Sequence, residues 1–339
     1  MTSLERVKNA ITGNPVDRIP CFPISIANAC EIIGVKQRDY NLDPECMADT
    51  LIKFREKTGF DGIYVSRDNW VYHEALGGIL TSPDDGESYS KNTVLQSMED
   101  FHTLSVPDPW NTQGMEVILR AAKRVVDRVG NEYYIQANID TGPFTLGGVL
   151  LGLERFLVDI TSNDEGIING YLSFCTDVVI AYGQAMLETG VHGIQFGDAS
   201  ASLVGPHYFE KYVLPWEGKV GDCFQGKDCD LWIHICGKTD QFLYYLRTVH
   251  FQGFEVDTHV PLPLARNLLG DEFALKGNLD TTFLLQETPE AIYNKTREII
   301  KSGSFKTGII MSPGCAVPRM TPLENLIAMK KACEDTMFL

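Results

Sequence analysis

The sequence predicts an α/β protein, a single (β/α)8 TIM barrel, from its length, its alternating pattern and the way its strands end. Its 339 residues suit one elaborated barrel, since such barrels commonly run to about 250 residues or more. Short β-branched or aromatic runs recur with helical stretches between them, and most runs end in a polar residue. Eight such alternations predict a parallel barrel surrounded by helices.

The predicted strands cover residues 19–25, 62–68, 133–140, 193–198, 230–236, 251–257, 273–278 and 308–312. Between them, residues 166–189 show the helical pattern, with apolar side chains falling on one stripe. The first helix is expected to be capped by Ser3. The last is expected to have Thr321 as its N-cap, Pro322 at its first position and Glu324 completing a capping box.

The alternation lapses once, at residues 69–110, where GG, PDDG and PDPW turns follow one another. A segment this long without its own strand and helix pattern is typically functional. We therefore predict one domain spanning residues 1–339, with residues 69–110 as an insertion after the second strand that roofs the active site.

Composition excludes several classes of function. The formal charge of -16 argues against nucleic-acid binding, because a phosphate backbone would meet a repelling field. No stretch approaches the ~20 apolar residues of a membrane span, and the charged N-terminal segment is not typical of a signal peptide. The nine cysteines form no disulfide-like frame, so reduced thiols in a cytoplasm are expected.

A His-x-Cys-Gly at the end of the fifth predicted strand is the most informative motif. Alternate residues of a strand share a face, so His234 and Cys236 can reach one ion. Cys315 follows the eighth strand, and in a parallel barrel both strands end at the same mouth. These three residues predict a metal site with an open fourth position, which is typical of catalytic zinc.

Two simpler interpretations stay open for this motif. A histidine beside a cysteine is often only packed in a core. A fourth ligand from Glu255, Asp257 or His259 would instead close the site and make the metal structural. Two thiolates and one imidazole suit zinc better than iron or magnesium, and such an ion can hold a thiolate or an ether oxygen for alkyl transfer.

Four segments carry a resemblance to a known family: RVKNAITGNPVDRIPCFP (6–23), GNLD (277–280), HICG (234–237) and SPGCAVPRMTPLENL (312–326). Together they resemble the uroporphyrinogen decarboxylase superfamily, and more narrowly its zinc-dependent, corrinoid-linked methyltransferase branch. The resemblance spans nearly the whole chain and implies the barrel fold. It also implies that His234, Cys236 and Cys315 are zinc ligands. The decarboxylases themselves carry an arginine-rich motif where this chain has CFPISIANAC, so decarboxylation is the weaker alternative.

The resemblance leaves two methyl-transfer reactions open. Members of this branch move a methyl group from a methoxylated aromatic to Co(I) of a corrinoid protein, or from a methylated corrinoid protein to a thiol, coenzyme M. A thiol with a sulfonate would favour cations at the mouth, where aromatic side chains are more frequent. The cations near the strand ends are Arg67, Lys238, Lys276 and Arg319. We therefore expect an aryl methyl ether O-demethylase, with coenzyme M methylation as the alternative.

In the expected mechanism, zinc polarises the ether oxygen while Co(I) attacks the methyl carbon. Asp140, Asp198 and Asp257, at strand ends, are the expected acids that assist the leaving group, although such residues also tie barrel loops together. The expected substrate-binding residues are Trp70, Tyr72, His73, Asn138, Phe196, Trp232 and Asn278. Ordinary core packing is the simpler interpretation for each aromatic.

The corrinoid is expected on a separate partner protein. Residues 257–262 (DTHVPL) echo an Asp-x-His-x-x-Gly cobalt-ligating motif, but Leu262 replaces the glycine. No second, Rossmann-like domain with its own glycine loops is evident in these residues. A non-catalytic, zinc-stabilised binding subunit is the remaining alternative.

Overall fold

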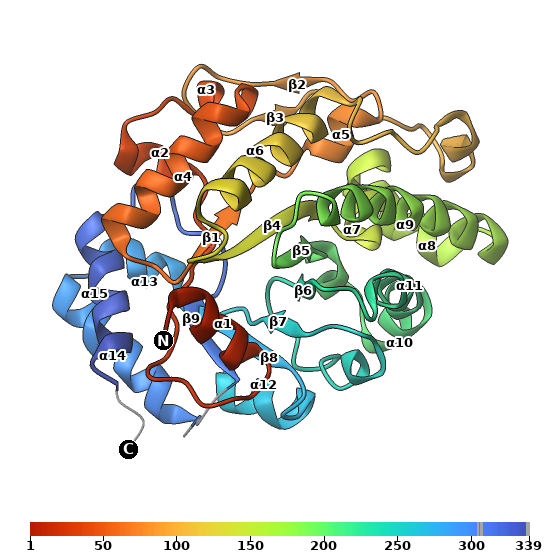
Figure 1. Cartoon of the computed structure of the whole chain (residues 1–339). Helices are drawn as coiled ribbons and strands as arrows, with labels where there is room; N and C mark the ends of the chain where they lie inside the picture. Colours follow the sequence, from red (N-terminus) through yellow and green to blue (C-terminus); the bar gives the residue numbers. More distant parts are fainter. Residues whose placement is uncertain (304, 306–307, 337–339) are drawn as a thin grey trace.

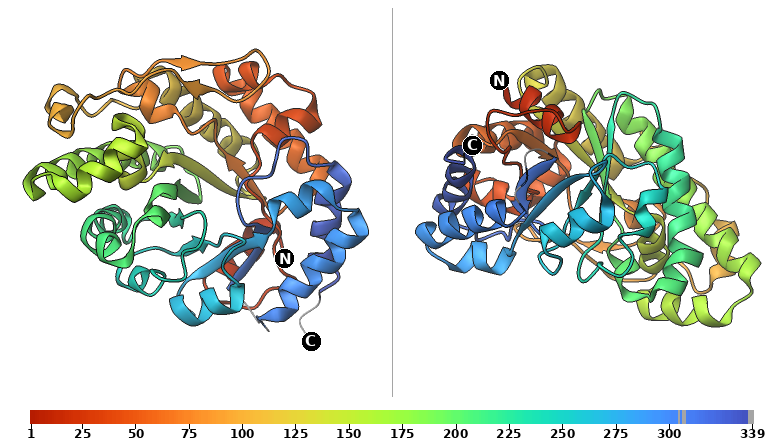
Figure 2. Two further views of the ribbon diagram at one scale, coloured as in Figure 1. Left: turned by 180° about the vertical axis from the view of Figure 1, so that it is seen from behind. Right: turned by 90° about the horizontal axis from the view of Figure 1, so that it is seen from below.

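The computed structural model describes residues 1–303, 305 and 308–336. Parallel strands form one sheet that curls around a common centre, with helices outside it (Figures 1 and 2). In sheet order the strands are β1 (Gly62–Val65), β4 (Tyr134–Thr141), β5 (Gly193–Gly197), β6 (Asp230–His234), β7 (Gly253–Glu255), β8 (Ala274–Leu279) and β9 (Ile309–Pro313). The predicted α/β barrel fold is confirmed, and seven of the eight predicted strands are present.

The first predicted strand, residues 19–25, is not a regular strand. Cys21 forms a single parallel bridge with Met311 of β9, and its carbonyl accepts a hydrogen bond from the backbone of Asp61, directly before β1. Two prolines in the segment have no backbone N–H, so they cannot extend the ladder. The segment nevertheless fills the gap between β9 and β1 and completes the barrel.

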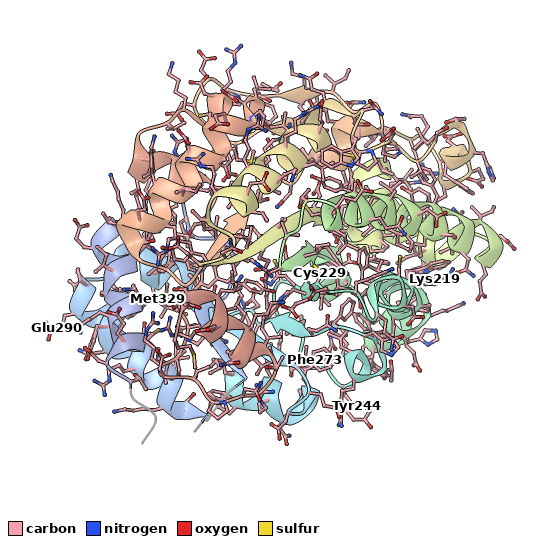
Figure 3. The ribbon with its side chains drawn as sticks, viewed as in Figure 1. Lys219, Cys229, Tyr244, Phe273, Glu290 and Met329 are labelled. Carbon is pink, nitrogen blue, oxygen red and sulfur yellow. The ribbon has the colours of Figure 1, made fainter. Side chains whose placement is uncertain are left out.

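The helices cover the outside of the barrel (Figure 1). They are α1 (Ser3–Ile11), α2 (Ala27–Ile33), α3 (Gln37–Leu42), α4 (Pro44–Thr58), α5 (Val71–Ala75), α6 (Gln113–Val129), α7 (Pro143–Leu151), α8 (Leu153–Ser162), α9 (Glu165–Leu187), α10 (Pro206–Tyr208), α11 (Leu214–Phe224), α12 (Leu262–Leu269), α13 (Thr281–Gln286), α14 (Pro289–Ser302) and α15 (Leu323–Glu334). Short 3₁₀ turns are η1 (Met98–Thr103), η2 (Ala199–Leu203) and η4 (Tyr245–Thr248), and η3 (Phe209–Val213) is a π-helical turn. Met329 of α15 is buried, while Glu290 of α14 is exposed (Figure 3).

Two predicted helix starts were wrong by one position. The first helix is capped by Thr2, whose side chain accepts from the backbone of Glu5 in a capping box, because a box requires the Glu three residues after the cap. The last helix begins at Leu323 with extended Pro322 before it, and no side chain caps it. The backbone of Thr321 is already engaged in a turn with Pro318.

The insertion after β1 carries a short antiparallel hairpin of β2 (Leu80–Thr81) and β3 (Tyr89–Ser90). His73 of α5 anchors it, because the buried imidazole Nε2 lies 2.9 Å from the carbonyl of Asn92 and 3.0 Å from the hydroxyl of Ser90. In the part of the chain that the structure describes, no helix combines the length and apolar character that a membrane crossing requires.

The barrel interior is layered along its axis. Phe22, Tyr134 and Trp232 belong to one apolar cluster at the lower level, where the Trp232 indole N–H donates to the Tyr134 hydroxyl at 3.2 Å. Above it, Lys276 pairs with Glu255 at 2.9 Å, and both side chains are buried. Trp232 therefore lies in the floor of the barrel, two residues below His234, rather than at the mouth where the sequence placed it.

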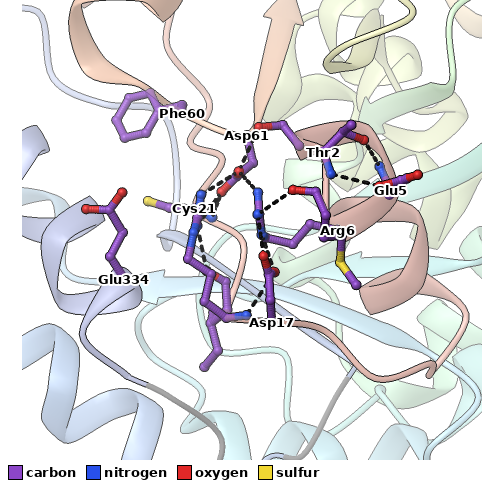
Figure 4. Close-up of polar contacts among 12 residues, drawn as sticks. Thr2, Glu5, Arg6, Asp17, Cys21, Phe60, Asp61 and Glu334 are labelled. Atoms are coloured by element: carbon purple, nitrogen blue, oxygen red, sulfur yellow. Dashed lines mark hydrogen bonds and ion pairs between the residues drawn. The ribbon is translucent and has the colours of Figure 1, made fainter.

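A buried ionic network holds the opposite end of the barrel. The fully buried carboxylate of Asp61 accepts hydrogen bonds from Arg6 at 2.7 Å, from Arg18 at 2.8 Å and from the backbone of Cys21 at 2.9 Å (Figure 4). Arg6 also pairs with Asp17 at 2.6 Å. The Asp61 carboxylate thus joins α1, residues 18–21 and the start of β1.

Replacing this carboxylate is expected to destabilise the fold strongly. Asp61→Ala removes the buried carboxylate that pairs with both Arg6 and Arg18, and breaking a buried pair typically costs about 3–5 kcal/mol. The free energy of unfolding in urea measures the loss. In the control Asp49→Ala, the broken pair with Arg128 is exposed, so the cost should stay below about 1 kcal/mol. Equal losses in both variants would contradict the role of Asp61.

Candidate metal centre at the barrel mouth

His234, Cys236 and Cys315 meet at the C-terminal mouth of the barrel. His234 ends β6, Cys236 follows it on the same face, and Cys315 lies two residues after β9. The His234 Nε2 is 3.0 Å from the Cys236 sulfur, which is 4.0 Å from the Cys315 sulfur. All three ligand atoms lie within 4.8 Å of one another. The structure therefore brings together the three residues that the sequence predicted as ligands.

Neighbouring strands fix the orientation of this cluster. The His234 Nδ1–H donates to the backbone carbonyl of Glu255 at 2.9 Å, so Nε2 is the nitrogen that faces the cysteines and would bind a metal after losing its proton. The carboxylate of Asp257 accepts from the backbone of Gly237 at 2.8 Å. Gly237 has a φ of 83°, a left-handed conformation that suits glycine. Both contacts hold the turn that carries Cys236.

The electrostatics of the cluster favour thiolate at Cys315. Hydrogen bonds from Cys236 and His234 lower the pKa of Cys315 to about 4, against the effect of burial. The Cys315 thiolate in turn, together with burial, raises the pKa of the Cys236 thiol. Burial acts to lower the pKa of His234, but the Cys315 thiolate raises it to about 9.

The ligand atoms face a cavity of about 120 Å³. It is lined by Ile24, Ile26, Tyr64, Asn69, Asn138, Asp140, Thr141, Gln195, Gly197, Ala199, His234, Cys236, Cys315 and Ala316. A second cavity of about 370 Å³ lies beside it and shares part of this lining, including Asn69 and Thr141. We call them the metal cavity and the outer cavity. Trp70 and Glu87 of the insertion line the outer cavity.

Asp140 is the predicted acid that lines the metal cavity. It is buried, with 5% of its surface exposed, and adopts a φ of 68°. Its Oδ2 accepts from the backbone N–H of Tyr72 at 2.9 Å, whereas its Oδ1 has no hydrogen-bond partner. Burial raises its pKa to about 7, although the Tyr72 hydrogen bond opposes this.

A chain of neutral polar groups lines the same cavity. The Tyr64 hydroxyl donates to Gln195 at 2.5 Å and accepts from the amide of Asn138 at 2.7 Å. The side-chain oxygen of Asn138 is also close to the backbone N–H of Asp140. Asn138 was a predicted substrate-binding residue, whereas Tyr64 and Gln195 were missed. Period-two alternation along β1 and β5, counted from the inward residues of β6, could have found them.

Several other predicted residues lie outside both cavities. The backbone of Tyr72 reaches Asp140, but its ring is buried against Tyr182, and His73 anchors the insertion hairpin. Phe196 is fully buried against Phe251. Trp70 alone among the predicted aromatics lines the outer cavity. The substrate-binding roles of Tyr72, His73 and Phe196 remain predictions, and their positions outside the two cavities do not support them.

Asp198 and Asp257 have structural contacts that use their carboxylates. Asp198 is fully buried at the start of α7, where it accepts from the backbone and hydroxyl of Thr145 at 2.7 and 2.6 Å, and burial raises its pKa to about 6. Burial opposes the ionisation of Asp257, but hydrogen bonds from Gly237 and His259 lower its pKa. The amide of Asn278 donates to the carbonyl of Asp257 at 3.1 Å. These residues hold the loops around the cluster, and their direct roles in chemistry stay predictions.

The structure favours an open site over a closed one. Of the residues that could supply a fourth ligand, Glu255 pairs with Lys276, and Asp257 with its neighbour His259 at 2.6 Å. Among the described residues, the only cluster of metal-ligating side chains is the group of three at the mouth. All three of its members line the metal cavity.

The sequence model of the uroporphyrinogen decarboxylase (URO-D) family matches residues 2–336. The chain belongs to this family. A methylcobamide:CoM methyltransferase of Methanosarcina acetivorans is 29% identical, with 98% of each chain covered. A methylated-thiol–coenzyme M methyltransferase of Methanosarcina mazei is 28% identical, covering 99% of this chain and 90% of the relative. A solved methyltransferase from Methanosarcina mazei has the same fold as this chain, with a TM-score of 0.88, 23% identity and 99% of each chain covered.

The buried carboxyl of Asp140 makes stability depend on pH. Its pKa rises from the ordinary 3.8 to about 7 in the folded chain, so its contribution is fully present below about pH 3.8 and is lost as pH rises towards 7. Asp140→Asn removes this dependence and retains an oxygen for the Tyr72 hydrogen bond. From pH 5 to pH 8 the wild type should therefore lose about 2–3 kcal/mol relative to Asp140→Asn.

Urea unfolding of both proteins at the two pH values measures this difference. The exposed Asp127→Asn variant serves as the control, because its side chain is 59% exposed and its pair with Lys123 lies on the surface. A stability difference between wild type and Asp140→Asn that stays constant with pH would contradict the assignment.

Proposed function

We propose that this chain is a zinc-dependent methyltransferase that moves a methyl group from a methylated corrinoid protein to a thiol. The observation that supports it most directly is the three-ligand cluster, open towards a cavity. It occurs in a chain whose relatives over nearly full length are named for methyl transfer from methylcobamide or a methylated thiol to coenzyme M. These relatives favour the thiol reaction over the aryl methyl ether reaction that the sequence placed first.

The residues present fit a zinc ion. A tetrahedral zinc with bonds of about 2.3 Å to sulfur and about 2.0–2.1 Å to nitrogen requires ligand atoms about 3.5–3.8 Å apart. Two pairs in the cluster are 3.0 and 4.0 Å apart, and the third lies within 4.8 Å, so small side-chain shifts suffice. Two cysteines and one histidine are also ligands that zinc prefers. His234, Cys236 and Cys315 would hold it, and the fourth position would face the metal cavity.

Zinc bound there would supply a position where a thiol sulfur is held as thiolate, ready for alkylation. In the overall reaction the sulfur lone pair forms a bond to the methyl carbon. The cobalt–carbon bond breaks with its electron pair on cobalt, so methyl-Co(III) becomes Co(I), and the thiol proton is released. Glu255 and Asp257 keep the ligands oriented. Tyr64, Asn138 and Gln195 line the space beside the sulfur.

We propose that residues 69–110 roof this site, as the sequence predicted. Trp70, Glu87 and Ser88 of this segment line the outer cavity. Asp68, directly before it, accepts from Ser88 at 2.7 Å and so holds the hairpin over the mouth. The corrinoid would be presented by a partner protein that docks on this side of the barrel.

Two other functions have less support. Decarboxylation of a tetrapyrrole would need cations for its carboxylates, and the segment that closes this barrel carries none between Ile19 and Cys30. A non-catalytic subunit with a structural metal would need a fourth protein ligand. In the described part of the chain, neither Glu255 nor Asp257 belongs to the group of ligating side chains.

Removal of one ligand should abolish metal binding. Purified wild-type protein is expected to hold about one zinc per chain, whereas His234→Ala and Cys315→Ser should hold almost none. Inductively coupled plasma mass spectrometry measures the zinc content. Cys223→Ser is the control, because Cys223 lies outside the cluster and its sulfur accepts a hydrogen bond from the Gln184 amide at 3.4 Å. Full zinc content in the ligand variants would contradict the site.

The direction of transfer can be read from the cobalt spectrum under anaerobic conditions. With a methylated corrinoid protein and 2-mercaptoethanol, the enzyme should convert methyl-Co(III) to Co(I), and Cys315→Ser should do so at least about 100-fold more slowly. With Co(I) corrinoid protein and a methoxyphenol, no methyl-Co(III) should form. Demethylation of the aryl ether without methylation of any thiol would reverse the proposal.

A further inference from the structure

We propose that the thiol accepted by this enzyme carries a positively charged or uncharged polar group, and not a sulfonate or another anion. This inference rests on the proposed thiol methylation and specifies its substrate class. It sets the chain apart from relatives named for coenzyme M, whose thiol carries a sulfonate. The charges around the two cavities are the reason.

Among the described residues that line the metal cavity, the one charged side chain besides the ligands is the carboxylate of Asp140. Only 5% of the surface of Asp140 is exposed, and its Oδ1 has no hydrogen-bond partner. An unpartnered buried oxygen costs free energy unless a ligand supplies a donor. An ammonium or hydroxyl group on the thiol would supply one, whereas an anion would be repelled.

The outer cavity offers no free cation either. Arg67 lines it, but its guanidinium pairs with Asp68 at 3.2 Å and with Glu74 at 2.9 Å, and only 5% of its side chain is exposed. Asp68 and Glu87 line the same cavity. The described lining of this cavity therefore carries more negative than positive charge.

The other cations near the strand ends are also engaged or displaced. Lys276 is buried in its pair with Glu255, and Arg319 pairs with Glu31 and Asp85. Exposed Lys238 lines neither cavity. Lys91 lines a third cavity, beyond Trp70, that shares no lining residue with the metal cavity.

Trp70 adds a favourable surface for a cation. Its indole lines the outer cavity and the third cavity, and it is partly exposed. Indole faces attract ammonium groups through their quadrupole and give nothing comparable to a sulfonate. Aromatic and acidic side chains together are the usual means of selecting cationic ligands.

Three thiols test the inference, because they share a two-carbon spacer and differ in charge. They are cysteamine (ammonium), 2-mercaptoethanol (uncharged) and 2-mercaptoethanesulfonate (sulfonate). With zinc-loaded enzyme, methylated corrinoid protein and pH 8, kcat/KM for cysteamine should exceed that for the sulfonate by about tenfold or more. The difference should lie mainly in KM.

Variants separate the cavity charge from the intrinsic reactivity of each thiol, which is the same in every protein. Asp140→Asn should lower the cysteamine-to-sulfonate ratio by about tenfold, and asparagine tolerates the left-handed backbone there. Glu87 is exposed and lines the outer cavity, so Glu87→Gln should leave the fold intact and lower the ratio less than Asp140→Asn does. Asp84→Asn, on the same hairpin but lining neither cavity, should leave the ratio unchanged.

The outcomes distinguish this inference from the proposed function. Efficient methylation that is fastest with the sulfonate, or a ratio unchanged in both Asp140→Asn and Glu87→Gln, would overturn the charge selectivity and leave thiol methylation standing. Failure to methylate any of the three thiols would overturn the proposed function, and the inference with it.

Discussion

The hydrogen bond from the His234 imidazole to the backbone carbonyl of Glu255 is the contact on which the site depends. It ties the end of β6 to β7 and fixes which nitrogen of His234 faces the two cysteines. The side chain of the same Glu255 points into the barrel and pairs with Lys276. One residue thus orients the metal-binding histidine through its backbone and occupies the middle layer of the barrel with its carboxylate.

The buried Lys276–Glu255 pair holds the layer beneath the ligands, but its burial costs desolvation free energy. Burial lowers the pKa of Lys276, although the Glu255 carboxylate opposes this. The ammonium group also donates to Gln136 at 2.8 Å and lies 4.2 Å from the centre of the Phe22 ring. Polar, charged and aromatic partners together offset the desolvation of the pair. Because replacing one partner would strand the other, the pair favours a single arrangement of the layer beneath the ligands.

The sequence alone predicted which side chains share a strand face, because that depends on periodicity. It did not predict how deep in the barrel each side chain lies. Alternation correctly placed Trp232, His234 and Cys236 on one face of β6, and strand ends correctly placed Cys315 at the same mouth. Alternation cannot tell how deep a residue lies, so Trp232 was assigned to the mouth although it packs against Tyr134 in the floor. Likewise, a strand-end aspartate such as Asp198 looks the same in sequence whether it faces a ligand or caps the N-terminus of a helix.

With zinc bound as proposed, the charges of the site lead to the same conclusion as the cavity lining. Two thiolates and a neutral imidazole balance a divalent ion, so a substrate thiolate adds one negative charge at the base of the metal cavity. Asp140, whose pKa is about 7, would add a second when ionised. Like charges in a buried site destabilise each other, and no described cation in the lining is free to offset them. A positive group on the substrate, placed beside Asp140, would offset the negative charges of both the substrate thiolate and the Asp140 carboxylate. This stabilisation would be largest while the sulfur is a thiolate.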